Sequence, residues 1–350
     1  MPSLELPSYI PLHKRGSRWK SSSSESEFQA EDSHKPCLWR DNLPPWTDKN
    51  TTYSVGVVGL HEEIEDFHAW VSPTPIAHQS RLEVVERVRS CVSQLWPAAR
   101  LEIFGSFKTG LYLPSSDLDL VVFGKWEAIP LLSLERELLN RGIALPETME
   151  VLDRATVPII KMMDRVSRIK VDISFNMING IKAAELIKLF KKKYPALPKL
   201  VCVLKHFLIN RDLSCVFTGG LSSYCLTLMV VSFLQLHRRR DAGAPAANLG
   251  VLLLEFLELY GCSFNYSSLA ISVTDEGKYL KKNEVHVEPD ITHRWVPAAG
   301  LTVEDPLQPG NDLARGSFRI GLVRQAFAVA YRQLCRGRRG GGLSKILLVD

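Results

Sequence analysis

The stretch EIFGSFKTGLYLPSSDLDLVVFG, residues 102–124, decides the fold of this 350-residue chain. Its last part, LDLVVF, has the β-branched and aromatic side chains of a buried strand. Side chains alternate between the two faces of a strand, so Asp117 and Asp119 share one face while the apolar residues share the other. Upstream, Gly105 and Ser106 indicate a turn. The stretch therefore predicts two neighbouring carboxylates beside a Gly-Ser turn.

A third carboxylate follows in IKVDISFNM, residues 169–177, where Asp172 interrupts a second short apolar strand. Taken alone, a D-x-D pattern is equally typical of a surface strand edge, and Asp172 of a turn. Together, three acids on two neighbouring strands predict a metal cage, because Mg²⁺ prefers hard oxygen ligands. Two ions can hold both the attacking and the leaving oxygen of a phosphoryl displacement. The pattern predicts two Mg²⁺ or Mn²⁺ ions acting on a nucleoside triphosphate.

This combination resembles the nucleotidyltransferase superfamily that includes DNA polymerase beta and the poly(A) polymerases. Further motifs are similar to those of the non-canonical poly(A) polymerases, and most of all to their nuclear RNA-surveillance (Trf4-like) branch. They are LHEEIEDFHAW, VPIIK, KAAELIK, FTGGLSSYCLTLM and EDPLQPGNDLAR. The resemblance covers residues 51–335. Lys108 departs from it, since the branch has a small hydroxyl residue there, and so does the ending RGRRGGGLSKILLVD.

The resemblance assigns roles to individual residues. Asp117 and Asp119 would bind both ions, while Asp172 would complete the catalytic ion site and help to deprotonate the RNA 3′-hydroxyl. The candidate nucleotide-binding residues matched to the family's motifs are Gly105, Ser106, Gly180, Lys205, Ser223, Tyr224, Asn311 and Arg315. Lys205 is expected to contact the triphosphate and Tyr224 to stack on the base. No histidine spacing indicates zinc.

Each of these assignments has a plainer alternative. Gly219-Gly220 could be an ordinary break, with Ser222 as a helix cap and Tyr224 in the core. Lys205 could be a helix-surface lysine, and Gly180 a turn glycine that ends a strand segment. Residues 309–312, Pro-Gly-Asn-Asp, have the composition of a simple turn.

The expected fold is α+β, with a mixed-sheet nucleotidyltransferase palm inserted in a mostly helical poly(A)-polymerase central domain. We expect strands near residues 101–104, 118–123, 149–152, 157–161 and 169–175, and helices near 55–70, 81–95, 181–193, 197–210, 221–237, 251–260 and 318–334. Ser54 is a candidate cap for the first helix. The expected parts are a disordered Ser/Pro-rich tail (1–50), an N-terminal helix joining the helical domain (51–77), the palm (78–180), the helical nucleotide-recognition domain (181–335) and an Arg/Gly-rich tail (336–350).

Charge and composition suit an RNA-binding enzyme. The net charge is only +5, but basic residues cluster at 191–193, 238–240 and 336–339, which suits a phosphate backbone or, equally, a solvated surface. Three glycines at 340–342 cannot sustain a helix, so the segment 336–345 is expected to be mobile. Seven cysteines without a C-x-x-C pair indicate a reducing compartment. We read no signal peptide and no membrane span.

The resemblance implies a polynucleotide adenylyltransferase that adds adenylate from ATP to RNA 3′ ends and releases pyrophosphate. It also implies RNA processing in the nucleus and nucleolus, with the cytoplasm left open. The implied partners are a zinc-knuckle RNA-binding protein, a helicase and the exosome. Asn311 stands where uridylate-adding relatives carry histidine, which favours adenine. The alternatives are a terminal uridylyltransferase, a catalytically silent scaffold of an RNA-decay complex, and an unstable splice or gene-model variant.

Overall fold

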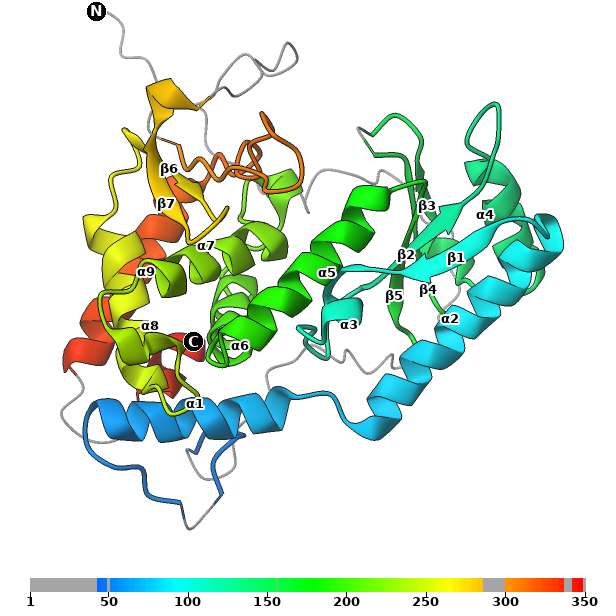
Figure 1. The fold of residues 1–350 in the computed structure, drawn as a ribbon. Helices are drawn as coiled ribbons and strands as arrows, with labels where there is room; N and C mark the ends of the chain where they lie inside the picture. The colour runs from blue at the N-terminus through cyan, green and yellow to red at the C-terminus, as the bar shows by residue number, and fades with distance from the viewer. Residues whose placement is uncertain (1–42, 49–50, 156, 286–299, 337–341, 349–350) are drawn as a thin grey trace, which may run out of the picture. The chain divides into compact units, whose positions relative to one another are not determined.

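A five-stranded mixed sheet carries the acidic residues in the computed structural model of the chain (Figure 1). The structure describes residues 43–48, 51–155, 157–285, 300–336 and 342–348. The strands are β1 (Arg100–Ile103), β2 (Leu118–Phe123), β3 (Glu150–Leu152), β4 (Ile159–Met163) and β5 (Lys170–Phe175), in the order β1-β2-β5-β4-β3. β2 and β5 are parallel, and the other neighbours are antiparallel. The two strands with aspartates are therefore adjacent.

Helices α2 (Pro75–Leu95) and α4 (Leu131–Asn140) pack against this sheet and share one hydrophobic core with it. That core contains Val84 and Val88 of α2, Leu134 and Leu138 of α4, and Leu118, Leu120 and Val122 of β2. The apolar face of β2 thus points into the core, as the period-two pattern predicts. Its aspartate face is left for the site.

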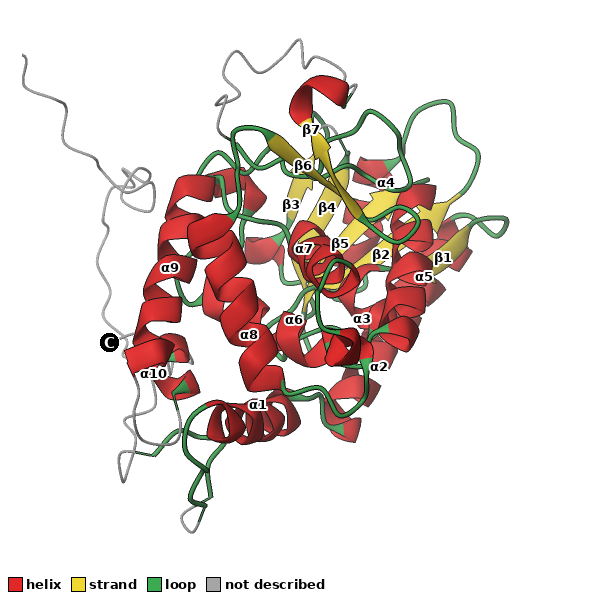
Figure 2. Ribbon diagram, turned by 60° about the vertical axis from the view of Figure 1, so that its left-hand side comes forward, coloured by secondary structure: helices red, strands yellow, loops and turns green. Residues whose placement is uncertain are grey.

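The rest of the chain is mainly helical and has a second core. Its helices are α1 (Val57–Val71), α5 (Ile178–Lys193), α6 (Leu197–Ile209), α7 (Ser223–Gln235), α8 (Leu249–Glu258), α9 (Ile320–Arg336) and α10 (Leu343–Leu347), with a hairpin of β6 (Leu269–Ser272) and β7 (Lys278–Lys281) (Figure 2). Short helical turns are η2 (Pro146–Thr148), η3 (Val216–Thr218), η4 (Arg240–Gly243), η5 (Leu259–Ser263) and η6 (Lys282–Glu284). Within the described part of the chain, no helix is long and apolar enough to cross a membrane.

Helix α1 precedes the palm in sequence but belongs to the helical core. Its residues Ile64 and Phe67 are completely buried there, in the same cluster as Leu200 and Leu204 of α6. The chain therefore starts in the helical part, passes into the palm and returns at α5. The α+β fold with a palm inserted in a helical domain is confirmed, while the predicted domain boundaries stay predictions.

The strands lie within two residues of their expected positions, but three local predictions were wrong. Helix α2 begins at Pro75, six residues early, because Thr74 caps it by accepting a hydrogen bond from the Ala77 N–H. Ser54 does not cap α1, since its N–H and hydroxyl both donate to Glu62. Gly180 lies inside the first turn of α5 and ends no strand.

Two predicted tails contain packed structure. The tail expected over residues 1–50 includes the described residues 43–48, among which Trp46 is buried against Phe67 at 5.0 Å between ring centroids. The ending expected to be mobile includes α10, whose Leu343, Ile346 and Leu347 are buried. An apolar face at helical spacing was present in LSKIL, and its burial outweighs the preceding glycines. The remaining residues of both tails lie outside the described part.

Candidate active site

Four charged residues form a row across the sheet. Register pairs Asp119 on β2 with Asp172 on β5, Asp172 with Lys161 on β4, and Lys161 with Glu150 on β3. The Lys161 Nζ donates to Asp172 Oδ2 at 2.6 Å. Paired residues on neighbouring strands have their Cβ atoms close together. The sheet therefore places Asp119 and Asp172 side by side, with Asp117 just before β2.

The Gly-Ser turn lies directly against Asp119. Gly105 and Ser106 open the short helix α3 (Gly105–Thr109), where Gly105 has a positive φ of 63°. A Cβ atom on Gly105 would lie 2.0 Å from Asp119 Oδ2, so no other residue fits there. The Ser106 N–H donates to the Asp119 carboxylate. Sequence reasoning thus placed this turn correctly beside the acids.

The acids repel one another electrostatically. Burial, followed by the charges of Asp172 and Asp117, raises the pKa of Asp119 to about 7. Burial and then the charge of Asp172 also raise the pKa of Asp117, while Lys170, Lys161 and Lys205 oppose this rise. Carboxylates crowded in this way are stabilised by a bound cation. The site has the electrostatics of a cation-binding site.

Lys205 reaches the palm from α6. It is 5% exposed, and its Nζ donates to the Leu111 carbonyl at 3.0 Å, within the segment that leads into Asp117. Burial lowers its pKa, and the nearby charges of Asp119 and Asp117 partly counter this. Lys205 is therefore not a surface lysine. It is a buried cation that joins the helical part to the acidic segment.

The basic run at 191–193 proves to be partly structural. The Lys191 Nζ donates to the Thr109 carbonyl at the end of α3, and Lys193 forms an ion pair with Glu276. These two lysines have partners within the protein, which weakens the interpretation of this run as a bare phosphate-binding surface. The Lys191 contact instead fixes α3, and with it the Gly-Ser turn, against α5.

The segment 304–315 folds as a tightly bonded loop. Asn311 donates from Nδ2 to Asp305 Oδ2 at 2.9 Å, and its N–H donates to the Gln308 carbonyl. Asp312 accepts from two main-chain N–H groups, and its pKa is raised by burial and lowered in part by those bonds and by the charge of Arg315. The segment is a turn, as its composition predicts, and it also fixes the Asn311 side chain.

Tyr224 and Ser223 lie at the start of α7. Ser222 caps this helix by accepting from the Cys225 N–H, so the capping alternative holds for Ser222, and Ser223 is exposed. The Tyr224 hydroxyl is buried and has no hydrogen-bond partner among the described residues. Burial, followed by the charge of Asp305, raises its pKa. An orphaned buried hydroxyl near the loop of Asn311 is what a bound polar ligand would satisfy.

Gly180 is close to the palm rather than to the loop. A Cβ atom on it would lie 2.6 Å from the Phe104 ring, one residue before the Gly-Ser turn. The preceding residue, Asn179, donates from Nδ2 to Gln308 Oε1 at 3.3 Å. The start of α5 therefore contacts both the Gly-Ser segment and the 304–315 loop. The structure brings the predicted residues of the palm and of the helical part into one connected region.

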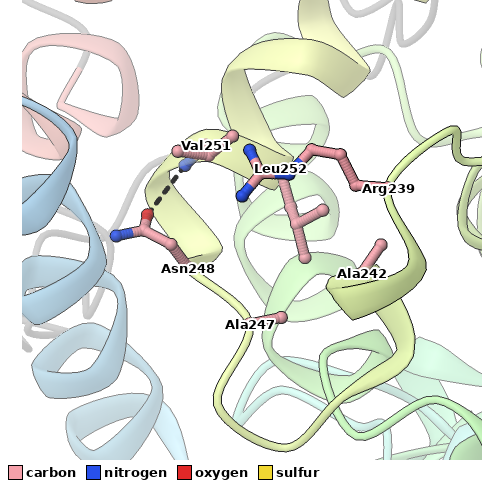
Figure 3. A pocket seen from close by; sticks show the side chains of 6 residues that line it. All are labelled: Arg239, Ala242, Ala247, Asn248, Val251 and Leu252. Atoms are coloured by element: carbon pink, nitrogen blue, oxygen red, sulfur yellow. Dashed lines mark hydrogen bonds between the residues drawn. The ribbon is translucent and has the colours of Figure 1, made fainter.

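One hollow elsewhere does not belong to this region. It has an empty volume of about 160 Å³ and lies at the start of α8, lined by Arg239, Ala242, Ala247, Asn248, Val251 and Leu252 (Figure 3). Asn248 caps the helix there by accepting from the Val251 N–H. Sites for small molecules are usually about 300–1,000 Å³. This hollow is too small for a nucleotide.

Comparison with known proteins gives the family. A family model described as the central palm domain of mitochondrial-like poly(A) RNA polymerase matches residues 60–192, and one described as Cid1 family poly A polymerase matches residues 248–311. The inactive non-canonical poly(A) RNA polymerase protein Trf4-2 of Drosophila melanogaster is 40% identical over 299 residues, which are 83% of this chain and 73% of that protein.

This chain belongs to the Trf4-type poly(A) RNA polymerases. Poly(A) RNA polymerase cid14 of Schizosaccharomyces pombe is 41% identical over 277 residues, and poly(A) RNA polymerase protein 2 of Saccharomyces cerevisiae is 40% identical over 276. Each alignment covers 77% of this chain but only 39% and 46% of those proteins. The chain therefore spans less than half of these two relatives and about three quarters of the fly protein.

Solved structures agree with the fold. The polymerase core of TRAMP, an RNA surveillance complex, has a TM-score of 0.70 at 36% identity, covering 82% of this chain and 90% of that one. The Cid1 poly(U) polymerase has a TM-score of 0.71 at 22% identity, covering 83% and 98%. The second likeness bears on the fold alone. Together they identify the arrangement of palm and helical part as that of the polymerase family.

Within this poly(A) polymerase fold, the palm match contains Gly105, Ser106, Asp117, Asp119, Asp172 and Gly180. Sequence reasoning missed Lys161, the partner of Asp172, although it had a signal. Lys161 is the charged residue between buried Ile160 and Met162 on β4. A lysine at a period-two position in an apolar strand indicates an acidic neighbour on the same face.

Proposed function

We propose that this chain adds adenylate from ATP to the 3′ ends of RNA, as a template-independent poly(A) polymerase. The observation that carries the proposal is the pairing of Asp119 with Asp172 on adjacent parallel strands, with Gly105 held against Asp119. Family membership supports the same chemistry. Because the chain spans only part of most relatives, the activity is proposed for this chain rather than transferred from them.

The donor set fits a divalent cation. Asp117, Asp119 and Asp172 offer hard oxygen ligands, and burial followed by the charges of the other two raises the pKa of Asp119 to about 7. In the described residues no three His, Cys, Asp or Glu side chains are gathered closely enough to hold one ion as they stand. Asp172 is bonded to Lys161 instead. We infer that Asp172 exchanges this lysine for a cation when nucleotide binds.

Bound Mg²⁺ or Mn²⁺, as a pair of ions, would stabilise the charge on the attacking and leaving oxygens of the transfer. The chain's own residues do the rest. Asp172, released from its bond to Lys161, accepts the proton of the RNA 3′-hydroxyl. Lys205 supplies a cation for the triphosphate, and the turn at Gly105 and Ser106 lies beside it. Gly180, without a side chain, lets the start of α5 pack against Phe104, next to the Gly-Ser turn.

The helical part is proposed to select adenine. Ser223 binds phosphate at the start of α7, Tyr224 contacts the nucleotide, and Arg315 holds the loop near Asp312. Asp305 accepts from one of the two N–H donors of the Asn311 amide, which orients this side chain and its Oδ1 acceptor. The exocyclic amino group of adenine is a donor, whereas the corresponding position of uracil is an acceptor. This fixed amide therefore favours ATP over UTP.

We further propose that the reaction serves RNA surveillance and processing in the nucleus and nucleolus. The likeness to the TRAMP polymerase core at 36% identity supports this setting. The proposed partners are a zinc-knuckle RNA-binding protein, a helicase and the exosome. Each is inferred from the family and can be checked by reconstitution with purified components.

Primer extension tests the function. Purified chain is incubated with an oligo(A) primer, Mg²⁺ or Mn²⁺ and one nucleotide at a time, and we expect extension with ATP in preference to UTP. Asp117→Ala or Asp172→Ala should abolish extension without lowering the melting temperature, because neither side chain packs in the core. Val329→Ala, an exposed change on α9, is the matched control. Full extension by either aspartate variant would overturn the assignment.

A second function is favoured by one finding. The fly relative is named as inactive although 40% identical, so related chains exist as non-enzymatic proteins. A scaffold of an RNA-decay complex would bind RNA or partners without any metal-dependent extension. Failure of the wild-type chain to extend a primer with any nucleotide, while still binding RNA, would support this alternative.

A further inference from the structure

An exposed apolar patch lies on the chain just before α7. In turn η3, Val216 is 42% and Phe217 is 90% exposed, while Phe318 just before α9 is 59% and Leu322 in α9 is 46% exposed. We call these four residues the η3 patch. Phe217 is the most exposed of the large apolar side chains in the described part of the chain. Neither the acid chemistry nor base selection uses it.

The two parts of the patch are fixed to each other. The Arg319 N–H donates to the Gly219 carbonyl at 2.9 Å. A Cβ atom on Gly219, which has a φ of +85°, would lie 2.3 Å from the Phe318 ring, and one on Gly316 would lie 2.6 Å from Val216. The glycines therefore let the turn and the segment before α9 pack together. Exposed rings on such a fixed backbone lose little conformational entropy when they bind a ligand.

Two arginines are linked to the segment beside the patch: Arg319 follows Phe318 and contacts Asp212, which Arg211 precedes. The Arg211 guanidinium stacks on Phe207 at 3.8 Å and donates to its carbonyl, and Arg319 donates to the Asp212 carbonyl at 3.3 Å. Both cations are thus positioned by neutral main-chain oxygens. Asp212 also exposes a carboxylate here, so the local balance is one net positive charge. An anionic ligand with flat apolar faces matches this combination of rings and cations.

We infer that the η3 patch is a stacking platform for single-stranded RNA, with Phe217 as its main contact. Bases stack on aromatic rings while arginines contact the backbone phosphates. The patch is six residues ahead of Ser223 in sequence and joined to Gly219, at the start of the proposed nucleotide-binding segment. The inference rests on the proposed function, because it names where the RNA substrate is held outside the reacting end.

A protein partner fits the patch less well. Stable protein interfaces bury about 800 Å² on each side. On α9, the exposed Leu322 is followed one turn later by the polar Gln325, which interrupts the apolar surface. A few separate rings between arginines suit individual bases better than a continuous protein surface.

Binding of labelled oligo(A) to the full chain, measured by fluorescence anisotropy without nucleotide, tests the platform. Phe217→Ala should raise the Kd roughly fivefold or more, the effect of losing one stacked base. Phe217→Trp should restore binding, whereas Phe217→Leu should not, because leucine is apolar but cannot stack. Val329→Ala, on the same helix as Leu322, is the control. Since Phe217 is 90% exposed, its variants should keep the wild-type melting temperature.

The outcomes separate this inference from the proposed function. Oligo(A) binding by Phe217→Ala and Phe318→Ala equal to that of the wild type would overturn the platform and leave the patch for a protein. Wild-type failure to bind oligo(A) would overturn it as well. If the wild type binds RNA through Phe217 but never extends it, the platform stands and the polymerase function fails. The ATP KM should not change in Phe217→Ala.

Discussion

At the scale of single residues, local sequence patterns predicted the acidic site well. The alternation of faces along β2 depends only on that strand, so the face of Asp119 could be placed beforehand, while the neighbouring Gly-Ser turn came from the resemblance. The Lys161 contact with Asp172 depends on which strand lies next to β5 and in which register. Register comes from pairing between distant segments, and a single sequence does not state it.

The raised pKa of Asp119 predicts a pH-dependent cost of folding. A carboxyl whose pKa is raised in the folded protein contributes stability below its ordinary pKa of about 4, and loses it as the pH rises through about 7. Metal-free Asp119→Asn should therefore melt at a higher temperature than the wild type, with the larger gain at pH 8 and a smaller one at pH 5. Thermal unfolding in a chelator measures this.

Asp164 is a control for this prediction, because its pKa is shifted in the opposite direction to that of Asp119. It is buried and pairs with Arg87 at 2.7 Å, and although burial opposes the shift, hydrogen bonds from Arg87 and Ser167 lower its pKa. Its contribution is present above pH 4 and is lost as the pH falls below that value. Asp164→Asn should destabilise the protein at both pH 8 and pH 5. Equal responses of the two variants would show that Asp119 is not strained by its neighbours.

At the scale of elements, the periodicity of apolar residues predicted most helices and strands correctly. The wrong predictions concerned the residues at which these elements begin or end. Gly180 was expected to follow the last strand segment of the palm, as a glycine that nucleotide approaches or as a plain turn, yet it lies in the first turn of α5 against Phe104. The reason is a close approach between segments that are far apart in sequence. The composition of the loop 304–315 predicted a turn, and its resemblance to the family predicted a nucleotide-recognition loop. Its hydrogen bonds are compatible with both predictions.

The loop makes a specific prediction about base choice. Asn311→His removes the Oδ1 acceptor held in place by Asp305 and introduces a bulkier ring. We expect the ratio of kcat/KM for ATP to that for UTP to fall at least tenfold. Gln308→Ala, which removes a neighbouring side chain without altering Asn311, should change the ratio little. An unchanged ratio in Asn311→His would show that the loop does not select the base.

At the scale of the whole molecule, one buried carboxylate joins three distant segments. Glu63 on α1 is 1% exposed and accepts hydrogen bonds from the N–H groups of Gly342, Leu343 and Ser344, and from Trp46 Nε1. Composition suggested tails at both ends of the chain. It could not show this contact, because the partners are separated by up to 281 residues.

The hydrogen bonds of Glu63 are expected to contribute to the stability of the folded chain. Glu63→Gln puts an amide donor among main-chain donors, which leaves buried groups unpaired and should cost about 1–3 kcal/mol in the free energy of unfolding. Glu62→Gln, one residue away, alters only the surface hydrogen bonds from Ser54 and should cost less. Urea denaturation with a common slope measures both.

Deletion of residues 342–350 tests the same contact from the other side. It removes buried Leu343, Ile346 and Leu347 together with the donors to Glu63, so the melting temperature should fall further than in Glu63→Gln. In the shortened chain Glu63 has lost three of these donors, and replacing it with glutamine should then cost less than in the full chain. Equal costs in both chains would mean that Glu63 acts through Trp46 alone. A deletion that leaves the melting temperature unchanged would mean that α10 adds nothing to the core.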